Sequence, residues 1–460
     1  MIPTSCFKSY DIRGKTGIEL TPTFAYALGH AIATVLQPET AITGRDIRMT
    51  SPQLQAALCA GLSAAGVAVA DIGLCGTEEV YFATDHYAAD VGIMVTASHN
   101  PAEYNGFKLV GPGARPLSDA EFRAIRQTVA DSDVQLPFAP LRGNVVLRQP
   151  RAAYVERVLS FIDPARLKPL RVVVNAGNGA AGPTFDAIAN ALTDAGAPVE
   201  FIRINHAPDG TFPKGIPNPL LPENHAATGN IVRREGADFG VAWDGDFDRC
   251  FFFDQTGTFV PGEYIVGLLA KSVLQREPGA AIVHDPRVVW NTQRVVAAAG
   301  GRPISSRTGH ALVKAKMRQE EAAYGGEMSA HHYFRDFMYC DSGMIPLLLI
   351  LGLISESGQG LAAEVAEMRM RHPSSGEINF TVSDPQAVMD RIAMRYAREA
   401  THICHLDGLS MSFADWRFNL RASNTEPLLR LNIETRGNTA LLARHQHDLA
   451  NAIVNRDMAA

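Results

Sequence analysis

Short apolar, β-branched runs alternate with helix-like segments along most of this 460-residue chain. The strand-like runs end in small or polar residues and include 91–96, 171–175, 239–243 and 280–283. Helical periodicity appears between them, in the segments 52–65, 117–130, 183–194, 264–275 and 293–299. This alternation predicts an α/β protein, in which loops that carry ligand-binding residues lie at the carboxyl ends of the strands.

The chain is longer than one hydrophobic core usually supports, so we expect three or four domains of about 100 to 150 residues. Residues typical of linkers cluster near 143–150, after Arg249 and near 371–376. The last part of the chain reads as a smaller α+β unit. It is predicted to hold strands at 377–382, 416–421 and 428–434, a helix at 385–400 and a terminal helix.

The charge and cysteine content limit the environment and the partners of the protein. A net charge of -6 without a long Lys/Arg run argues against nucleic acid or an anionic membrane as the main partner. The six cysteines are scattered without a CxxC pair, which suits reduced thiols in a cytosol. The longest apolar stretch, 345–354, is too short to span a bilayer. We therefore expect a cytoplasmic protein that binds neither nucleic acid nor membrane.

Three aspartates, Asp244, Asp246 and Asp248, alternate directly after an apolar run and are followed by Arg249. In an extended segment alternate side chains share a face, so the three carboxylates can converge on one hard cation, and Gly245 leaves room for the backbone to approach. Grouped carboxylates are costly unless a positive charge neutralises them. An EF-hand loop fails at two positions, whereas an acidic turn at a strand end stays an alternative for this segment alone.

A glycine-rich segment presents a competing nucleotide motif. Gly177, Gly179 and Gly182 match the GxGxxG spacing after a strand-like run, with Glu200 about twenty residues on. The acid that contacts the ribose belongs at the end of the second strand, whereas Glu200 lies near the start of the run 199–204. We therefore interpret the glycines as a tight strand-to-helix turn that needs small residues for packing.

Ser98 lies at the exit of the strand-like run 91–95, in the segment TASHNP, and Lys108 follows ten residues later. A serine hydroxyl is a weak nucleophile, and a bound metal together with Lys108 could activate it toward phosphorus. His99 is a poor candidate for its base, because neighbours in an extended chain point to opposite faces and no GxSxG elbow surrounds Ser98. An ordinary Asn-Pro turn is the alternative.

Two further segments contain residues suited to binding a phosphosugar. In RASNTEP, Arg421, Ser423 and Thr425 offer a guanidinium fork and two hydroxyls that match phosphomonoester oxygens, although a capped polar turn would use similar residues. In GEMSAHH, Glu327 and Ser329 stand at alternate positions that suit vicinal sugar hydroxyls. An isolated histidine, in Thr-Gly-His at 308–310, is only a weak acid/base candidate by itself.

The segments TASHNP, DGDFDR, GEMSAHH and RASNTEP follow in this order, with KSYDIRG near the N-terminus. With them the chain resembles the α-D-phosphohexomutases, and most closely the bacterial phosphomannomutase/phosphoglucomutase group, over its whole length. The resemblance implies three mixed α/β domains followed by a smaller α+β C-terminal domain, at 1–146, 147–250, 251–371 and 372–460. It also implies a cytoplasmic isomerase that acts on a phosphosugar, and we expect a monomer.

The resemblance carries roles to particular residues. Ser98 looks like the serine that holds the transferable phosphoryl group and, with Asp244, Asp246 and Asp248, binds Mg²⁺. Arg249 would steady that phosphate, and Lys108 and His310 match the proposed proton carriers. The residues that the resemblance implies for substrate binding are Tyr10, Arg13, Arg287, Glu327, Ser329, His331, Arg421, Ser423, Asn424 and Thr425. Arg287 stands where some members have lysine, which keeps the charge but changes its geometry.

The implied reaction is reversible phosphoryl transfer between O1 and O6 of mannose or glucose phosphate, through a phosphoserine and a hexose 1,6-bisphosphate that also serves as activator. The C-terminal domain would open while the bisphosphate turns round and close for chemistry. The alternatives are a phosphoglucosamine mutase, which carries a different residue at Met328, a phosphatase or bisphosphate synthase, a dinucleotide-dependent enzyme and a non-catalytic binding protein. The last two leave Ser98 and the aspartates without a role.

Overall fold

The computed structural model describes residues 2–134, 143–422 and 428–454. Strands and helices alternate along the chain, so the predicted α/β pattern is confirmed. Contacts within the chain define two compact units. Unit 1 comprises Met1–Phe259 with His331–Gly358, and unit 2 comprises Val260–Ala330 with Gln359–Ala460.

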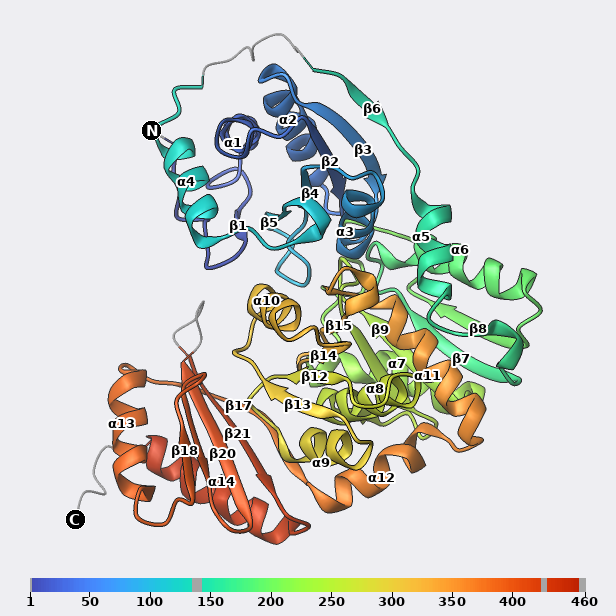
Figure 1. The fold of residues 1–460 in the computed structure, drawn as a ribbon, viewed down its shortest axis with the longest axis vertical. Helices are drawn as coiled ribbons and strands as arrows, with labels where there is room; N and C mark the ends of the chain where they lie inside the picture. Colours follow the sequence, from blue (N-terminus) through green and yellow to red (C-terminus); the bar gives the residue numbers. More distant parts are fainter. Residues whose placement is uncertain (1, 135–142, 423–427, 455–460) are drawn as a thin grey trace. The chain divides into compact units, whose positions relative to one another are not determined.

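The N-terminal part of unit 1 is a twisted sheet covered by helices on both faces. From one edge to the other its strands are β1 (Ile12–Lys15), β5 (Tyr104–Val110), β4 (Val91–Val95), β2 (Thr40–Arg45), β3 (Ala68–Leu74) and β6 (Val145–Leu147). Only β1–β5 and β5–β4 are antiparallel pairs. One face is covered by α1 (Pro22–Leu36), α2 (Ser51–Ala64) and α4 (Asp119–Ala130), and the other by α3 (Thr77–His86) (Figure 1).

A second sheet of unit 1 carries the acidic segment. Its strands follow the order β10 (Cys250–Asp254), β9 (Phe239–Trp243), β7 (Leu170–Asn175) and β8 (Val199–Ile204). The pairs of β7 with β8 and β9 are parallel, while β9 and β10 form an antiparallel hairpin. The flanking helices are α5 (Arg151–Leu159), α6 (Ala181–Asp194) and α7 (His225–Glu235). Unit 1 also contains β15 (His332–Phe334), β16 (Cys340–Asp341) and α11 (Met344–Ser357).

Backbone atoms of neighbouring segments pack closely against the glycine-rich turn between β7 and α6, as the packing interpretation predicts. A Cβ atom on Gly182 would lie 2.1 Å from the carbonyl oxygen of His206, and one on Gly179 would lie 2.8 Å from that of Gly245. Glu200 instead forms an ion pair with Arg171, its partner across the β7–β8 ladder. The small residues therefore allow close approach of chain segments, including the loop that carries the aspartates.

The first part of unit 2 has parallel strands in the order β13 (Arg302–Ser305), β12 (Ala281–His284) and β14 (Tyr324–Gly326). Its helices are α8 (Gly262–Arg276), α9 (Trp290–Ala298), α10 (His310–Glu320) and α12 (Leu361–Arg371). The loops after β12 and β14 carry Arg287, Glu327 and Ser329. The carboxyl ends of neighbouring parallel strands meet at one sheet edge, so these three residues come together.

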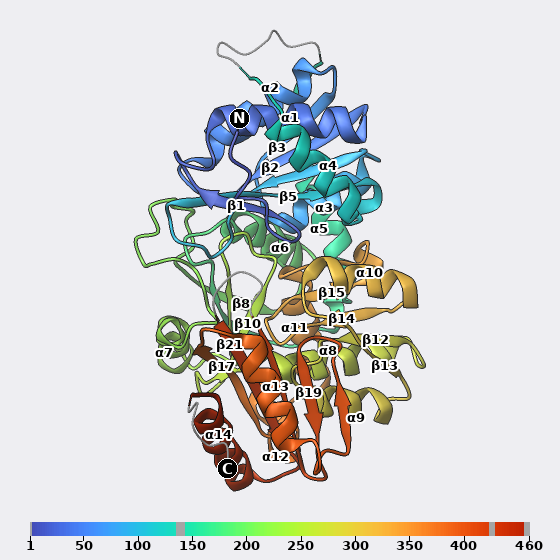
Figure 2. The same cartoon turned by 90° about the vertical axis from the view of Figure 1, so that its left-hand side faces the viewer.

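The C-terminal part of unit 2 is an antiparallel sheet in the order β17 (Ser374–Thr381), β21 (Leu428–Thr435), β20 (Trp416–Ala422), β19 (Leu409–Ser412) and β18 (His402–Cys404). Two helices, α13 (Pro385–Tyr396) and α14 (Thr439–Val454), share one apolar core with it (Figure 2). The predicted strands and helices of this region are confirmed. The short strands β18 and β19 were not predicted, and α13 ends before residue 400.

A buried ion pair joins the C-terminal sheet to the loop after β12. Glu434 on β21 accepts hydrogen bonds from Arg417 Nη1 at 2.7 Å and from two backbone N–H groups at the start of α9. Arg417 in turn donates to the carbonyl oxygens of Pro286 and Arg287, both at 2.9 Å. These bonds fix the backbone that presents the Arg287 side chain.

Within the described residues, no single helix is long and apolar enough to cross a membrane, and the consecutive helices α11 and α12 meet that criterion only when they are taken together.

Candidate active site

The loop after β4 places the Ser98 hydroxyl at the edge of the N-terminal sheet. Ser98 is almost completely buried and adopts the left-handed conformation, with φ 49°. Its backbone N–H donates to Thr96 Oγ1 at 2.9 Å, and its hydroxyl donates to Asp244 Oδ2 at 2.6 Å. Ser98 and the first aspartate of DGDFDR therefore touch, although 146 positions separate them in the sequence.

The expectation that His99 points away from Ser98 is wrong. The left-handed conformation of Ser98 interrupts the extended run, and His99 Nδ1 lies 3.0 Å from Ser98 Oγ. Burial, with the neighbouring Arg249 guanidinium second, holds the pKa of His99 well below its usual value. The neutral ring can therefore accept a hydrogen bond from Arg249 Nη2, which it contacts.

The three aspartates converge, but not in the way the sequence suggested. The segment is a tight turn of the β9–β10 hairpin rather than an extended strand, because Phe247 has φ 46° and its N–H donates back to Asp244 O. One carboxylate oxygen from each of Asp244, Asp246 and Asp248 lies within 4.8 Å of the others. Gly245 allows the approach of the serine loop, since a Cβ there would lie 2.4 Å from Ser98 O.

Two cationic side chains offset the charge of the aspartates. Lys108 Nζ lies 2.7 Å from Asp246 Oδ2 and 2.5 Å from Asp248 Oδ2. Burial alone would lower the pKa of Lys108, but these carboxylates outweigh burial and raise it. Arg249 Nε donates to Asp244 Oδ2 at 3.1 Å. Lys108 and Arg249 are therefore both charged in this group.

The carboxylates retain capacity for a metal ion. Asp246 Oδ1 and Asp248 Oδ1 are buried and accept no hydrogen bond from any described residue. Burial and the charge of Asp246 raise the pKa of Asp248, while Lys108 outweighs burial and lowers that of Asp246. A divalent cation would relieve this crowding, and carboxylate oxygens are its preferred ligands. The trio therefore fits a metal ion.

Arg48 contacts the loop that carries Ser98, and the sequence analysis did not single it out. Its buried guanidinium donates four hydrogen bonds to backbone carbonyl oxygens of the serine loop, those of Ser98, Asn100, Pro101 and Tyr104, at 2.5 to 2.9 Å. Asp46 lies 3.3 Å from Arg48 Nε and also accepts from the Thr96 hydroxyl. This pair shapes the loop that carries Ser98. The position of Arg48 just after β2 could have pointed to it from the sequence, because loops at strand ends carry functional residues.

Thr77 is a second residue that the sequence analysis missed. It begins α3, and its hydroxyl and backbone N–H donate to Asp246 Oδ2 and Asp246 O, at 2.6 and 3.1 Å. The N-terminus of a helix carries a partial positive charge, so α3 favours the ionised form of Asp246. The segment Gly-Thr-Glu-Glu at 76–79 is typical of a helix start, but nothing in it points to the aspartates.

His331 and Arg13 also lie with this group. His331 forms an isolated bridge with Arg249, and its Nδ1 lies 3.1 Å from Asp341 Oδ2. Burial alone would lower the pKa of His331, but Asp248 and Asp341 raise it. A ligand atom from each of these three residues lies within the same 4.8 Å limit as the aspartate trio. Arg13 Nη1 donates to Asn100 Oδ1 in the serine loop at 2.6 Å.

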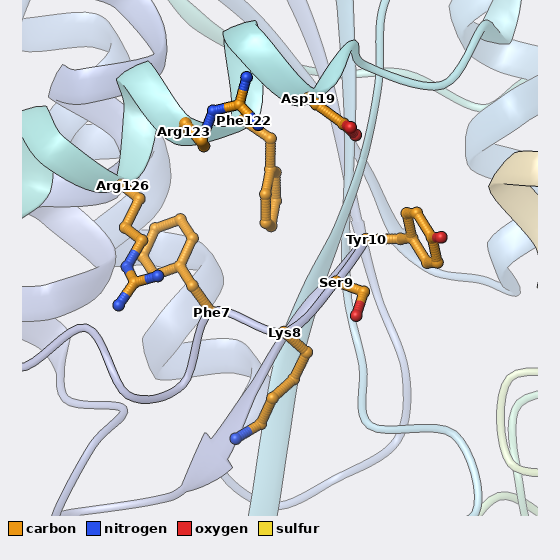
Figure 3. A pocket seen from close by; sticks show the side chains of 8 residues that line it. All are labelled: Phe7, Lys8, Ser9, Tyr10, Asp119, Phe122, Arg123 and Arg126. Carbon is orange, nitrogen blue, oxygen red and sulfur yellow. The ribbon is translucent and has the colours of Figure 1, made fainter. Parts of the chain in front are cut away.

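Tyr10 lies in a separate hollow of about 260 Å³ (Figure 3). The hollow lies between the N-terminal segment and α4, and the side chains that line it are Phe7, Lys8, Ser9, Tyr10, Asp119, Phe122, Arg123 and Arg126. In Figure 3 the Phe122 ring hangs from α4 toward its centre, while Tyr10 points away from Phe7. Of the two predicted N-terminal substrate residues, the contacts therefore connect Arg13 with the serine loop, while Tyr10 lines this hollow.

In unit 2 the structure brings Arg287, Glu327 and Ser329 together. Arg287 Nη2 donates to Asp285 Oδ2 at 2.8 Å and to Ser329 Oγ at 3.3 Å, and it lies 3.8 Å from Glu327 Oε1. Asp285 Oδ2 also accepts from the backbone N–H of Met328 at 2.8 Å, so it holds the predicted sugar loop. Burial alone would lower the pKa of Arg287, but Asp285 outweighs it and raises this pKa.

Two further predicted residues lie in unit 2. His310 begins α10, and the preceding Gly309 donates its N–H to Glu327 Oε1 at 3.1 Å, so His310 lies next to the sugar loop. Arg421 is nearly buried on β20 and lies 3.6 Å from Glu377. Three predicted phosphate ligands, Ser423, Asn424 and Thr425, lie outside the described residues.

Comparison with known proteins shows the family to which the chain belongs. Models of the phosphoglucomutase/phosphomannomutase family match four consecutive parts of the chain. The alpha/beta/alpha domains I, II and III match residues 4–135, 152–257 and 261–371, and the C-terminal domain matches 377–452. The chain belongs to the phosphoglucomutase/phosphomannomutase family.

Relatives and solved structures agree with this assignment. The chain is 54% identical to a phosphomannomutase of Salmonella montevideo, over 95% of this chain and 96% of that protein. It is also 54% identical to a phosphohexose mutase of Xanthomonas campestris pv. campestris, over 97% and 98%. A phosphoglucomutase/phosphomannomutase family protein from Burkholderia thailandensis has a similar structure, with a TM-score of 0.86, 32% identity and 98% coverage of both chains. The chain is therefore a hexose phosphate mutase, an isomerase of carbohydrate metabolism, with a buried acidic group that can hold a metal ion.

Proposed function

We propose that the enzyme moves a phosphoryl group reversibly between O1 and O6 of mannose or glucose phosphate, through a phosphoserine at Ser98 and a hexose 1,6-bisphosphate. The observation that carries this proposal is the contact of Ser98 Oγ with Asp244 Oδ2 at 2.6 Å, within a buried group of three aspartates. A hydroxyl beside a metal site and two fixed cations suits phosphoryl transfer, which depends on positioning and on charge stabilisation.

Mg²⁺ is the ion that we propose for Asp244, Asp246 and Asp248, together with an oxygen of phosphorylated Ser98. When bound, it would supply charge neutralisation at the phosphoryl oxygens. The two unsatisfied carboxylate oxygens of Asp246 and Asp248 support this assignment, as does the hard character of the donor set.

In the first half-reaction that we propose, the free hydroxyl oxygen of a hexose monophosphate attacks the phosphorus of phospho-Ser98. The new O–P bond forms and the P–Oγ bond breaks, giving the hexose 1,6-bisphosphate. The hydroxyl loses its proton to a base, and Ser98 Oγ gains one from an acid. Lys108 and His310 are the two groups that we propose as these proton carriers. Arg249 would hold the phosphoryl oxygens.

In the second half-reaction the bisphosphate has turned round, and its other phosphate returns to Ser98. Residues of unit 2 would bind the phosphate that is not being transferred and the sugar hydroxyls. We propose Arg287, Arg421, Ser423, Asn424 and Thr425 for the phosphate, Glu327 and Ser329 for the hydroxyls, and Tyr10, Arg13 and His331 of unit 1 as supporting residues. Both ends of the bisphosphate carry a phosphate, so one cationic site can hold either end.

A coupled assay tests the proposal with glucose 1-phosphate and mannose 1-phosphate, with and without a hexose 1,6-bisphosphate. We expect isomerisation of both substrates, a higher initial rate with the bisphosphate, and no turnover by Ser98→Ala. Intact-mass measurement of the wild-type enzyme after exposure to the bisphosphate should show one added phosphoryl group, which Ser98→Ala lacks. Full activity of Ser98→Ala would refute the phosphoserine role. Release of inorganic phosphate without isomerisation would indicate a phosphatase instead.

A further inference from the structure

One carboxylate, that of Glu377 on β17, lies among three guanidinium groups of unit 2. Arg430 Nη1 donates a hydrogen bond to Glu377 Oε1 at 3.1 Å. Arg287 Nη1 and Arg421 Nη2 lie 3.5 and 3.6 Å from the other oxygen, Oε2. Three arginines that converge on one anion form the arrangement expected around a phosphate group, and two of them are in the proposed phosphate site.

The two oxygens of Glu377 are held differently. Oε1 has the hydrogen bond from Arg430, whereas Oε2 is buried and accepts no hydrogen bond from any described residue. The contacts of Oε2 with Arg287 and Arg421 are therefore electrostatic and long. A stronger anion can replace Oε2 at these two arginines without breaking the Arg430 bond.

The arginines need an anion even without substrate. The side chains of Arg287 and Arg421 are only 5% and 9% exposed, so water screens their mutual repulsion weakly. Burial lowers the pKa of Arg421, the Arg287 charge lowers it further, and Glu377 opposes both effects. Asp285 holds Arg287 firmly at 2.8 Å, so Arg287 cannot move away to reduce this repulsion. Among the described residues, Glu377 is the carboxylate that forms ion pairs with both arginines.

We propose that Glu377 is an internal stand-in for the phosphate of the substrate. Its carboxylate holds Arg287 and Arg421 in place in the free enzyme. When the sugar binds, its phosphate replaces Glu377 Oε2 as the anion beside these two arginines, and the hydrogen bond between Arg430 and Glu377 Oε1 remains. The nearby negative charge weakens phosphate binding, which lets the bisphosphate leave the arginines when it turns round. This role deepens the proposed function and depends on it, because it requires that Arg421 binds phosphate.

Glu377→Gln tests the role, because glutamine keeps an oxygen acceptor for Arg430 and replaces the charged Oε2, which faces Arg287 and Arg421, with an uncharged NH2 group. Binding of glucose 1-phosphate is measured by calorimetry in the Ser98→Ala enzyme, which excludes turnover. We expect Glu377→Gln to tighten binding about three- to tenfold, since a repelling charge near the dianion is lost. The matched control is Glu399→Gln, which removes the same charge from an exposed position of unit 2 and should leave the affinity unchanged.

Steady-state kinetics with Ser98 intact provide a second readout. Glu377→Gln should lower KM and also lower kcat, because the phosphate leaves the arginines more slowly. A purely structural ion-pair partner would instead weaken binding and raise KM. Equal or weaker binding in a variant that melts like the wild type would therefore overturn the proposal.

Two further variants separate the possible failures. Glu377→Ala removes the same charge by a different steric change, and the same tightening is expected if the glutamine variant does not fold. If both variants fail to fold even in saturating inorganic phosphate, Glu377 is a structural partner and the proposal is wrong. Arg421→Ala should abolish most of the binding. If it does not, the proposed phosphate site is wrong, which is a different failure from that of the Glu377 role.

Discussion

Arg48→Lys tests whether a single guanidinium holds the loop that carries Ser98. Arg48 donates four hydrogen bonds to loop carbonyls, whereas a lysine ammonium has only three N–H donors around one nitrogen. At least one carbonyl therefore loses its donor, which costs about 1 to 3 kcal/mol for a buried group. The retained charge still pairs with Asp46 and so avoids the penalty of about 3 to 5 kcal/mol for a stranded buried carboxylate.

The main effect should appear in kcat. A displacement of the nucleophile by about 1 Å can slow a positioned reaction about 100-fold. We expect Arg48→Lys to fold, to melt at a lower temperature and to lose about 10- to 100-fold in kcat, with KM nearly unchanged because unit 2 supplies most of the proposed substrate contacts. The measurements are thermal denaturation and the coupled mutase assay.

Arg45→Lys is a matched control for this prediction. It makes the same chemical change three positions earlier, at a half-buried side chain that forms none of the described hydrogen bonds to the serine loop. If both variants had the Tm and kcat of the wild type, the four carbonyl contacts would not position Ser98. That result would refute the reasoning.

Three further variants test other buried titratable groups. Lys108→Met leaves two buried aspartates without their ammonium, so in EDTA we expect a loss of about 3 to 5 kcal/mol in the free energy of unfolding, and a smaller loss with Mg²⁺; equal losses would contradict the metal site. Glu434→Gln leaves the buried charge of Arg417 without its partner, and urea denaturation should show a loss of similar size in the free energy of unfolding. An unchanged free energy would show that the Arg417–Glu434 pair does not stabilise the fold. Burial, with the charge of His331 second, lowers the pKa of His332 to about 3. In the unfolded chain this histidine has its ordinary pKa of 6.5 and binds a proton below that pH, whereas in the folded protein it binds one only near pH 3. The free energy of unfolding therefore falls as the pH falls from 6.5 toward 3. Wild type should lose about 2 kcal/mol more than His332→Gln between pH 7 and 5, and identical losses would argue against this shift.

The strands and helices could largely be predicted because their signals are local. The apolar run 239–243 coincides with β9, and the predicted C-terminal strands and helices lie within a few residues of the observed ones. The strands β18 and β19 were missed because they are short, and β18 is largely exposed. Their pairing with each other and with β20 stabilises them, and that pairing is not a local property.

The loop conformations at the site could not be predicted in the same way. Both the serine segment and the aspartate segment were interpreted as extended, yet each contains a non-glycine residue with positive φ. Such residues are uncommon and persist where surrounding contacts hold them. At Ser98 these contacts come from the Arg48 guanidinium, which lies 50 positions away in the sequence, and from the Thr96 hydroxyl. Local sequence patterns reveal neither hydrogen bond.

The sequence alone determined which chemistry the chain can perform, because residue types decide it. A serine, three aspartates, a lysine and several arginines in ordered motifs indicate phosphoryl transfer, whatever their exact placement. Only the tertiary structure decided how these groups are held: Arg48 on the serine loop, Thr77 on Asp246 and Glu377 among the arginines. The physical reason is that charge and hydrogen-bonding capacity belong to the single residue, whereas the position of a buried partner depends on contacts between segments far apart in the chain.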